Sequence, residues 1–359
     1  MLSACARDKT EPYQVDHIVL KWHKSYNNDS FEKSIIGLNW ALSHVGAKYT
    51  IQASEISSNK ETIQVFPERC GLTVQGETTL TQLHQRITES ISYVENGYID
   101  IGHYVALLIG SSEHYYRLTN VPNTLSELES QYSFSPEIGY LNNSEISVQH
   151  RKILFSDQNN FNQLFVSQEV DSVTGQILEF ETLDLMENGQ PRFGVYDASG
   201  NRIVGAAPSL ATAGKPGKCM WCHESSIQPL FGLQNVQAGY LNPVLLGDTL
   251  VFFRNEHKNS QNLLSEGVNY QDLTEHILME LLYISYMEPS AERLALEWNM
   301  TESEVVNLLI GLPMHEQEEF TFLGMLYDRE DVENFAPYSA LPVSSSVREV
   351  VGNEVNHLN

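Results

Sequence analysis

The sequence contains few cysteines, few basic residues and no long apolar stretch. Its 359 residues include 4 cysteines, and 21 Lys and Arg stand against 46 Asp and Glu, which gives a formal net charge of −25. A protein of this charge repels phosphate backbones and anionic membrane surfaces, so no nucleic-acid partner is expected. No apolar run approaches the roughly 20 residues that cross a bilayer, so the body of the chain is not expected to span a membrane.

Common catalytic signatures are also missing. The chain has no G-x-S-x-G, no H-E-x-x-H, no phosphate-binding loop and no dinucleotide glycine pattern. Residues 291–309 resemble a helix-turn-helix in their apolar spacing, but the second predicted helix has no basic residue to contact phosphate or guanine. A plain helical corner is therefore expected there.

Apolar periodicity indicates an α+β protein. The expected helices cover 29–46 and 80–94 and begin again near 273 and 301, and the expected strands cover 49–53, 62–66, 114–121, 151–155, 163–170, 177–183 and 193–196. His84 is expected to lie off the buried stripe of its helix. The last four strands follow one another closely, with turn residues at 198–201, so they predict an antiparallel sheet. We expect a mixed N-terminal region, a central antiparallel β-sheet and a C-terminal helical lobe.

Two of the four cysteines lie beside a histidine in the segment Cys219-Met-Trp-Cys222-His223. C-x-x-C-H is the attachment pattern of c-type haem, and this segment resembles the c-type cytochromes. The resemblance implies that Cys219 and Cys222 form thioethers to one haem c and that His223 is an axial ligand of its iron. We expect a flexible loop over 214–218 and a short helix over 224–228, so that the central sheet carries a haem loop.

Other interpretations of this segment remain open. Zinc would need two further closely spaced ligands, and a thioredoxin-like dithiol normally opens the helix of a βαβ unit. A structural disulfide or a chance cluster is the third alternative. Lys215 and Lys218 either pair with haem propionates or are solvated loop charges. Cys70, which lies among apolar residues, is expected to be a small buried hydrophobic side chain.

A sixth iron ligand is harder to assign. In the class-I cytochromes that the motif resembles, a methionine follows the haem motif, and five methionines follow it here: Met279, Met287, Met300, Met314 and Met325. Met279 and Met287 are expected in the core, because they lie in an apolar helical segment. Met314 lies in a loop after a Gly-Leu-Pro break, next to His315, so it is the candidate for the sixth ligand.

The N-terminal residues Leu2-Ser3-Ala4-Cys5 resemble a bacterial lipobox. The resemblance implies a diacylglycerol on Cys5, which would anchor the protein to a membrane of the bacterial cell envelope, in the periplasm or on the outer surface. A complete export signal has a basic and an apolar region before the cysteine, and only four residues precede Cys5 here. Either the signal was trimmed, or the true start lies further upstream, or the match is chance. The expected segments are a lipoprotein tether (1–14), a mixed α/β region (15–135), a β-rich haem-bearing region (136–260) and a helical region (261–359).

Together these patterns predict a membrane-tethered monohaem cytochrome that transfers electrons outside the cytoplasm to or from a redox partner protein. Much of the chain is not needed to hold one haem, which keeps two alternatives open. The first is a haem enzyme that acts on a small oxidant or peroxide at an open iron. The second is a lipoprotein binding module whose haem or metal is structural.

Overall fold

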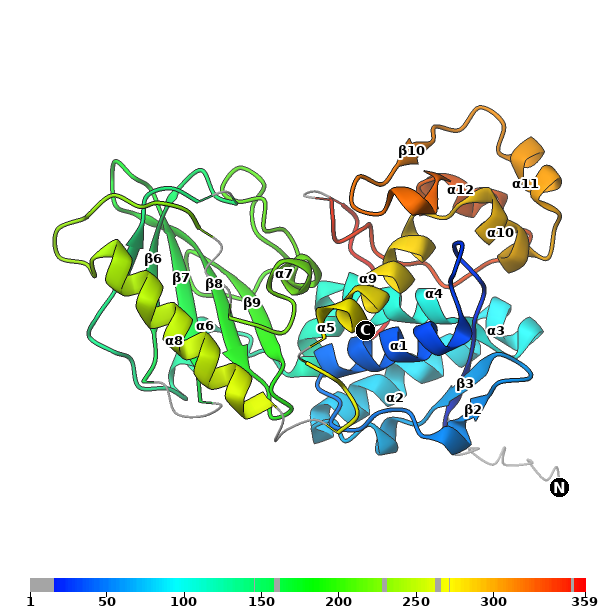
Figure 1. Ribbon diagram of the computed structural model, residues 1–359, viewed down its shortest axis with the longest axis horizontal. Coiled ribbons are helices and arrows are strands. Elements are labelled where there is room, and N and C mark those ends of the chain that lie inside the picture. The colour runs from blue at the N-terminus through cyan, green and yellow to red at the C-terminus, as the bar shows by residue number, and fades with distance from the viewer. Residues whose placement is uncertain are drawn as a thin grey trace, which may run out of the picture.

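A computed structural model of the protein describes residues 16–144, 146–157, 162–227, 231–261, 266–270, 272–349 and 352–359. It confirms an α+β fold with a central antiparallel sheet and a helical C-terminal region. Figure 1 shows the sheet and one long helix in one half of the molecule and most other helices in the other half. Cys5 and the expected tether lie outside the described residues. No described helix is long and apolar enough to cross a membrane.

The N-terminal part combines a small mixed sheet with six helices. The sheet has the order β2-β3-β1-β4, in which β1 is antiparallel to β3 and parallel to β4. Its strands are β1 (Ile18–Lys21), β2 (Ile56–Ser57), β3 (Thr62–Val65) and β4 (Ile99–Asp100). The helices are α1 (Phe31–His44), α2 (Val74–Glu89), α3 (Ile91–Asn96), α4 (Ile101–Val105), α5 (Ser112–Thr119) and α6 (Leu125–Glu129).

Several expectations for this part need correction. The helix expected over 29–46 is confirmed as α1, but the first strand of the hairpin forms at 56–57 instead of 49–53. The helix expected over 80–94 is two helices, because Ser90 adopts an extended backbone and its side chain caps α3. Residues 114–121, expected as a strand, lie largely in helix α5. His84 is fully buried, contrary to expectation, and its Nε2 contacts the Tyr104 hydroxyl at 2.9 Å.

The central sheet is antiparallel, as the sequence predicts, and it is a five-stranded meander in which β5 joins the four expected strands. Its strands run in chain order: β5 (Gly139–Leu141), β6 (His150–Phe155), β7 (Leu164–Val170), β8 (Ile177–Leu185) and β9 (Pro191–Asp197). Alternation places Phe165, Leu183 and Phe193 on one face, where they pair across neighbouring strands. Helix α8 (Pro243–Gln261) lies over the sheet (Figure 1), and its Phe253 ring lies 5.7 Å from the ring of Phe155.

The C-terminal region is helical, and its first long helix completes the core of the N-terminal part. Helix α9 (Leu273–Met287) packs against α1 and α4 and buries Met279 and Met287, as expected. The remaining elements are α10 (Ala291–Trp298), α11 (Glu302–Leu308), β10 (His315–Glu316), β11 (Met325–Leu326) and α12 (Arg329–Val332). α10 and α11 form a helical corner around a second, smaller core. We call β1–β4, α1–α6 and α9 the helical body.

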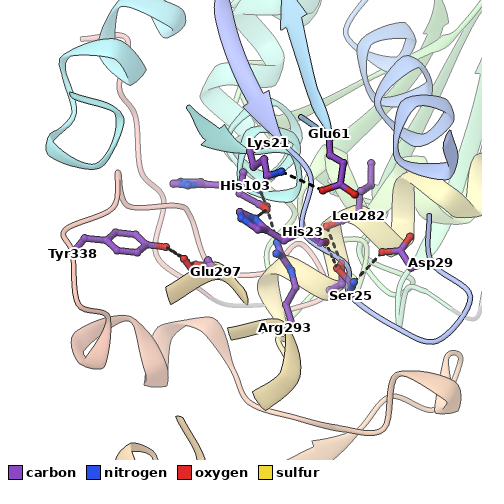
Figure 2. A network of polar contacts seen from close by, with 12 residues as sticks. Lys21, His23, Ser25, Asp29, Glu61, His103, Leu282, Arg293, Glu297 and Tyr338 are labelled. Carbon is purple, nitrogen blue, oxygen red and sulfur yellow. Dashed lines mark hydrogen bonds and ion pairs between the residues drawn. The ribbon is translucent and has the colours of Figure 1, made fainter. Parts of the chain in front are cut away.

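A buried ionic network joins the helical body to α10 and α12. Figure 2 shows its α10 residues Arg293 and Glu297, with Arg293 beside His23. Arg293 Nη2 lies 2.7 Å from Asp100 Oδ1, and the guanidinium of Arg329 binds both carboxylate oxygens of Glu297 at 2.8 and 3.0 Å. His23 Nδ1 lies 2.8 Å from the second oxygen of Asp100. We call Asp100, Arg293, Glu297 and Arg329 the helical network.

Candidate haem site

Helix α7 (Pro216–His223) contains the whole Cys219–His223 segment. Pro216 occupies its first turn, where a missing backbone N–H costs nothing, and Glu224 ends it with a positive φ of 51°. The expectation of a loop over 214–218 and a helix over 224–228 is therefore wrong for the described residues. Positions i, i+3 and i+4 of a helix share one face, so this helix brings Cys219, Cys222 and His223 together.

Helix α7 is held tightly against the helical body and against residues 344–349 and 352–358, which we call the C-terminal strap. A Cβ at Gly217 would lie 2.8 Å from the Ile109 carbonyl oxygen and 2.6 Å from Val347, so glycine permits this close approach. Lys215 Nζ lies 3.0 Å from Glu354 Oε2 and donates to the Ser345 carbonyl at 3.2 Å. Lys215 is buried, so it is neither a solvated loop charge nor turned toward the cysteines' cavity.

The two thiols and the imidazole of α7 line a cavity between α7, the central sheet and α8. Its volume is about 170 Å³, which is smaller than the roughly 300–1,000 Å³ of typical cofactor pockets, so a cofactor as large as haem would extend out through the open mouth. Most of the wall is apolar: Ile153, Phe165, Leu183, Phe193 and Val195 from the sheet, Leu250 from α8, and Ile227 and Phe231 from the connecting segment. Figure 1 shows α7 between the sheet and the helical body.

The environment of both thiols favours the protonated form. Cys70, Cys219 and Cys222 are free in the structure. Removal from water raises the pKa of Cys219 well above its usual value, and Glu181 adds to this effect. The pKa of Cys222 is raised as well by partial desolvation, although Lys218 opposes the shift. A redox dithiol needs an accessible thiolate, so this environment disfavours that alternative for the segment.

His223 is positioned as a neutral imidazole in the cavity wall. Its ring lies 5.5 Å from the ring of Phe193 on β9. Burial lowers the pKa of His223 to about 4, although a hydrogen bond with the Ser226 backbone opposes this effect. The neutral ring is the form that binds a metal ion, so no proton has to be displaced at physiological pH.

One end of the cavity is polar, and the sequence patterns did not identify it. Arg151 of β6 and Glu181 of β8 line the cavity, and Arg151 Nη2 donates to Glu181 Oε2 at 2.9 Å. The Nε of Arg151 pairs with Glu169 of β7, and Glu179 lies opposite Glu169 on β8. We call Arg151, Glu169, Glu179 and Glu181 the acid cluster. The sequence does contain a sign of this cluster: Glu169 lies an even number of positions from Phe165, and Glu179 and Glu181 lie an even number from Leu183. These glutamates therefore point to the same face of the sheet as the two apolar residues.

Lys218 and Met314 differ in their relation to the cavity. Lys218 lines it, and its ammonium donates to the Thr212 carbonyl at 2.7 Å, so it is placed to meet an anionic group at the mouth. Met314 is 40% exposed beside β10 and is not among the residues that line the cavity. Its neighbour His315 contacts Glu288 at 2.8 Å. Cys70 is buried in the core, as expected.

The donor set and the mainly apolar lining of the site are those that a covalently held haem would need. Within the described part of the chain, no three His, Cys, Asp or Glu side chains form a group that could hold a metal ion by themselves. A single histidine in an apolar pocket is instead what haem iron requires of the protein, because the porphyrin supplies the other four ligands. The chain matches no protein-family model, no curated protein and no solved structure.

Proposed function

We propose that the protein is a monohaem c-type cytochrome, in which Cys219 and Cys222 hold the haem and His223 binds its iron. The observation that carries the proposal is that all three side chains share one face of α7 and line one mainly apolar cavity. A bound haem would supply one-electron redox chemistry there. The protein's own residues would exclude water from the ring face, and Lys218 is available to a propionate.

The proposed role is electron transfer with a redox partner protein. The net charge of −25 favours a partner with a basic surface, because complementary charge accelerates encounter. The proposed location is the cell envelope, with a lipid on Cys5. The support for that location is the N-terminal sequence alone.

A second candidate function, catalysis at an open iron, is favoured by the composition of the cavity wall. Among the described residues that line it, His223 is the only histidine and there is no methionine. The polar pair Arg151 and Glu181 lies in the same cavity and could hydrogen-bond a small oxygen-containing ligand. This candidate differs from the first in requiring an exchangeable position on the iron.

The test of haem binding is expression in a host that has cytochrome c maturation machinery. We expect a haem c pyridine haemochrome spectrum and a haem stain that survives denaturing electrophoresis, because thioether bonds persist on unfolding. Cys219→Ser and Cys222→Ser should each weaken this stain severalfold, and the double variant should abolish it. Cys70→Ser is the matched control, because Cys70 lies outside the cavity and should leave the stain unchanged. A colourless wild type would contradict the proposal.

The same preparation separates the two candidate roles and tests the location. Rapid binding of carbon monoxide by the ferrous protein would favour the open-iron enzyme, and no binding would favour the electron carrier. If Met314 were the sixth ligand, Met314→Ala would open the iron; we expect no change, because Met314 does not line the cavity. Cys5→Ala should move the protein from the membrane to the soluble fraction, and retention in the membrane would contradict the anchor.

A further inference from the structure

The acid cluster is buried and carries more negative than positive groups. Glu169 is 0%, Glu179 is 1% and Arg151 is 6% exposed. The strand register places Arg151 opposite Glu169 and Glu169 opposite Glu179, so the charges meet across three adjacent strands. If all three carboxylates were ionised, one guanidinium would face two fully buried negative charges and the partly exposed charge of Glu181. Such an excess is costly, and protonation of a carboxyl relieves it.

The surroundings of the cluster support bound protons near neutral pH. Burial raises the pKa of both Glu169 and Glu179 to about 7, although Arg151 opposes the shift of each and the Ala207 N–H opposes that of Glu179. Ser147 also stabilises ionised Glu169, because its hydroxyl donates to Oε2 at 2.5 Å. The other charged or titratable groups nearest the cluster are Asp197 of β9, opposite Glu179, and Lys218, Cys219, Cys222 and His223 of α7, whereas α8 contributes the apolar Leu250.

A second observation points to proton binding at Glu179. Its Oε2 accepts a hydrogen bond from the Ala207 N–H at 2.8 Å, but its Oε1 has no hydrogen-bond partner among the described residues. A buried carboxylate oxygen without a donor is most stable when it carries a proton itself. The cluster is also continuous with the cavity, because Arg151 and Glu181 belong to both.

We propose that the acid cluster is a proton-binding site that takes up a proton when the cofactor in the adjacent cavity is reduced. The inference rests on the proposed function, since it requires a redox-active haem. A one-electron donor, either a redox partner protein or an electrode, supplies the electron to the iron. Water supplies the proton, which bonds to a carboxylate oxygen of Glu169 or Glu179. The added negative charge is thereby neutralised inside a poorly solvated region, where charges interact strongly.

The test is the midpoint potential of the haem-loaded protein measured from pH 5.5 to 8.5. In the wild type, the equilibrium constant for reduction should decrease by up to tenfold for each unit rise in pH around neutrality. For a one-electron couple, this decrease lowers the midpoint potential by about 59 mV per pH unit. Glu169→Gln with Glu179→Gln should remove most of this dependence. Glu256→Gln on α8 is the control, because Glu256 is exposed and outside the cavity wall. A pH-independent potential in the wild type, or an unchanged slope in the double variant, would overturn the proposal.

A second measurement covers the case in which the double variant does not fold. Redox-difference infrared spectra of the wild type should show a carboxylic-acid C=O band that grows on reduction and shifts in heavy water. A haem-loaded protein without such a band would overturn the proton site and leave the haem proposal standing. A protein without haem would instead overturn the proposed function.

Discussion

The central sheet and the helical body each bury a group of ionised side chains, but the two groups differ in charge balance. The helical network sets Asp100 and Glu297 against Arg293 and Arg329. Burial opposes ionisation of both carboxyls, but the neighbouring arginines outweigh it and hold the pKa of Asp100 and of Glu297 below the usual values. In the acid cluster, one arginine faces three carboxylates, and burial prevails.

The comparison teaches that burial alone does not decide the protonation of a carboxyl group. In both regions the acids are removed from water and contact arginine. A network with one arginine for each acid stays ionised at all physiological pH values. Removal of one of its arginines leaves a buried carboxylate without a partner. Fewer arginines than acids give a network that exchanges protons near neutral pH, whose stability depends on pH.

The largest expected effect comes from breaking the balanced network. Arg293→Met leaves the buried carboxylate of Asp100 without its guanidinium partner and should lower the free energy of unfolding by about 3–5 kcal/mol. Urea denaturation measures it. Adding Asp100→Asn should restore part of the stability, and a double variant no more stable than Arg293→Met would argue against the pairing.

A smaller and pH-dependent effect is expected in the sheet. The folded pKa of Glu169 and of Glu179 exceeds the unfolded value, so the folded state binds more protons and loses stability as pH rises from about 4.5 through 7. Arg151→Met should raise these pKa values further and extend the loss to higher pH. We expect a cost of roughly 1 kcal/mol at pH 5.5 and roughly 3 kcal/mol at pH 8.5. Equal costs at both pH values would remove the distinction between the two regions.

The smallest effect is expected at the surface and calibrates the other two. Arg86 and Glu89 form an ion pair of 3.4 Å on α2, with both side chains about half exposed. Arg86→Gln should change the free energy of unfolding by less than about 0.5 kcal/mol, because exposed pairs are solvated and screened. The change should shrink further in 0.5 M salt. A loss similar to that of Arg293→Met would show that burial is not the source of the larger effect.

The fold was more predictable from sequence in the sheet than in the helical body. Alternation of inward and outward residues is a local signal, and it located four strands of the meander to within a few residues. The prediction of a strand over residues 114–121 was wrong because Tyr115 and Tyr116, which favour strands, are buried in the core as part of helix α5. The expected helix over 80–94 is divided in two because Ser90 caps α3. Apolar periodicity alone does not reveal such a cap.

The sequence pointed to the two cysteines and the histidine of the candidate site but not to the residues that line its cavity. The spacing of Cys219, Cys222 and His223 is local, whereas Pro216 was interpreted as a loop residue although proline also begins helices. Assembly of the acid cluster depends on the register of three strands, so no local pattern contains it. Met314 was chosen as a candidate ligand because it lies in a loop after a Gly-Leu-Pro break, but only packing decides which loops reach a cavity.

The C-terminal strap bears on the order of events during synthesis. Lys215 meets Ser345 across a sequence separation of 130 residues, and Gly217 fits against Val347 in the same strap. While the chain is being made or exported, α7 therefore emerges long before the residues that fix it in place. An enzyme that modifies the two thiols during that interval would meet a helix without the strap, and arrival of the strap would then fix α7 in place.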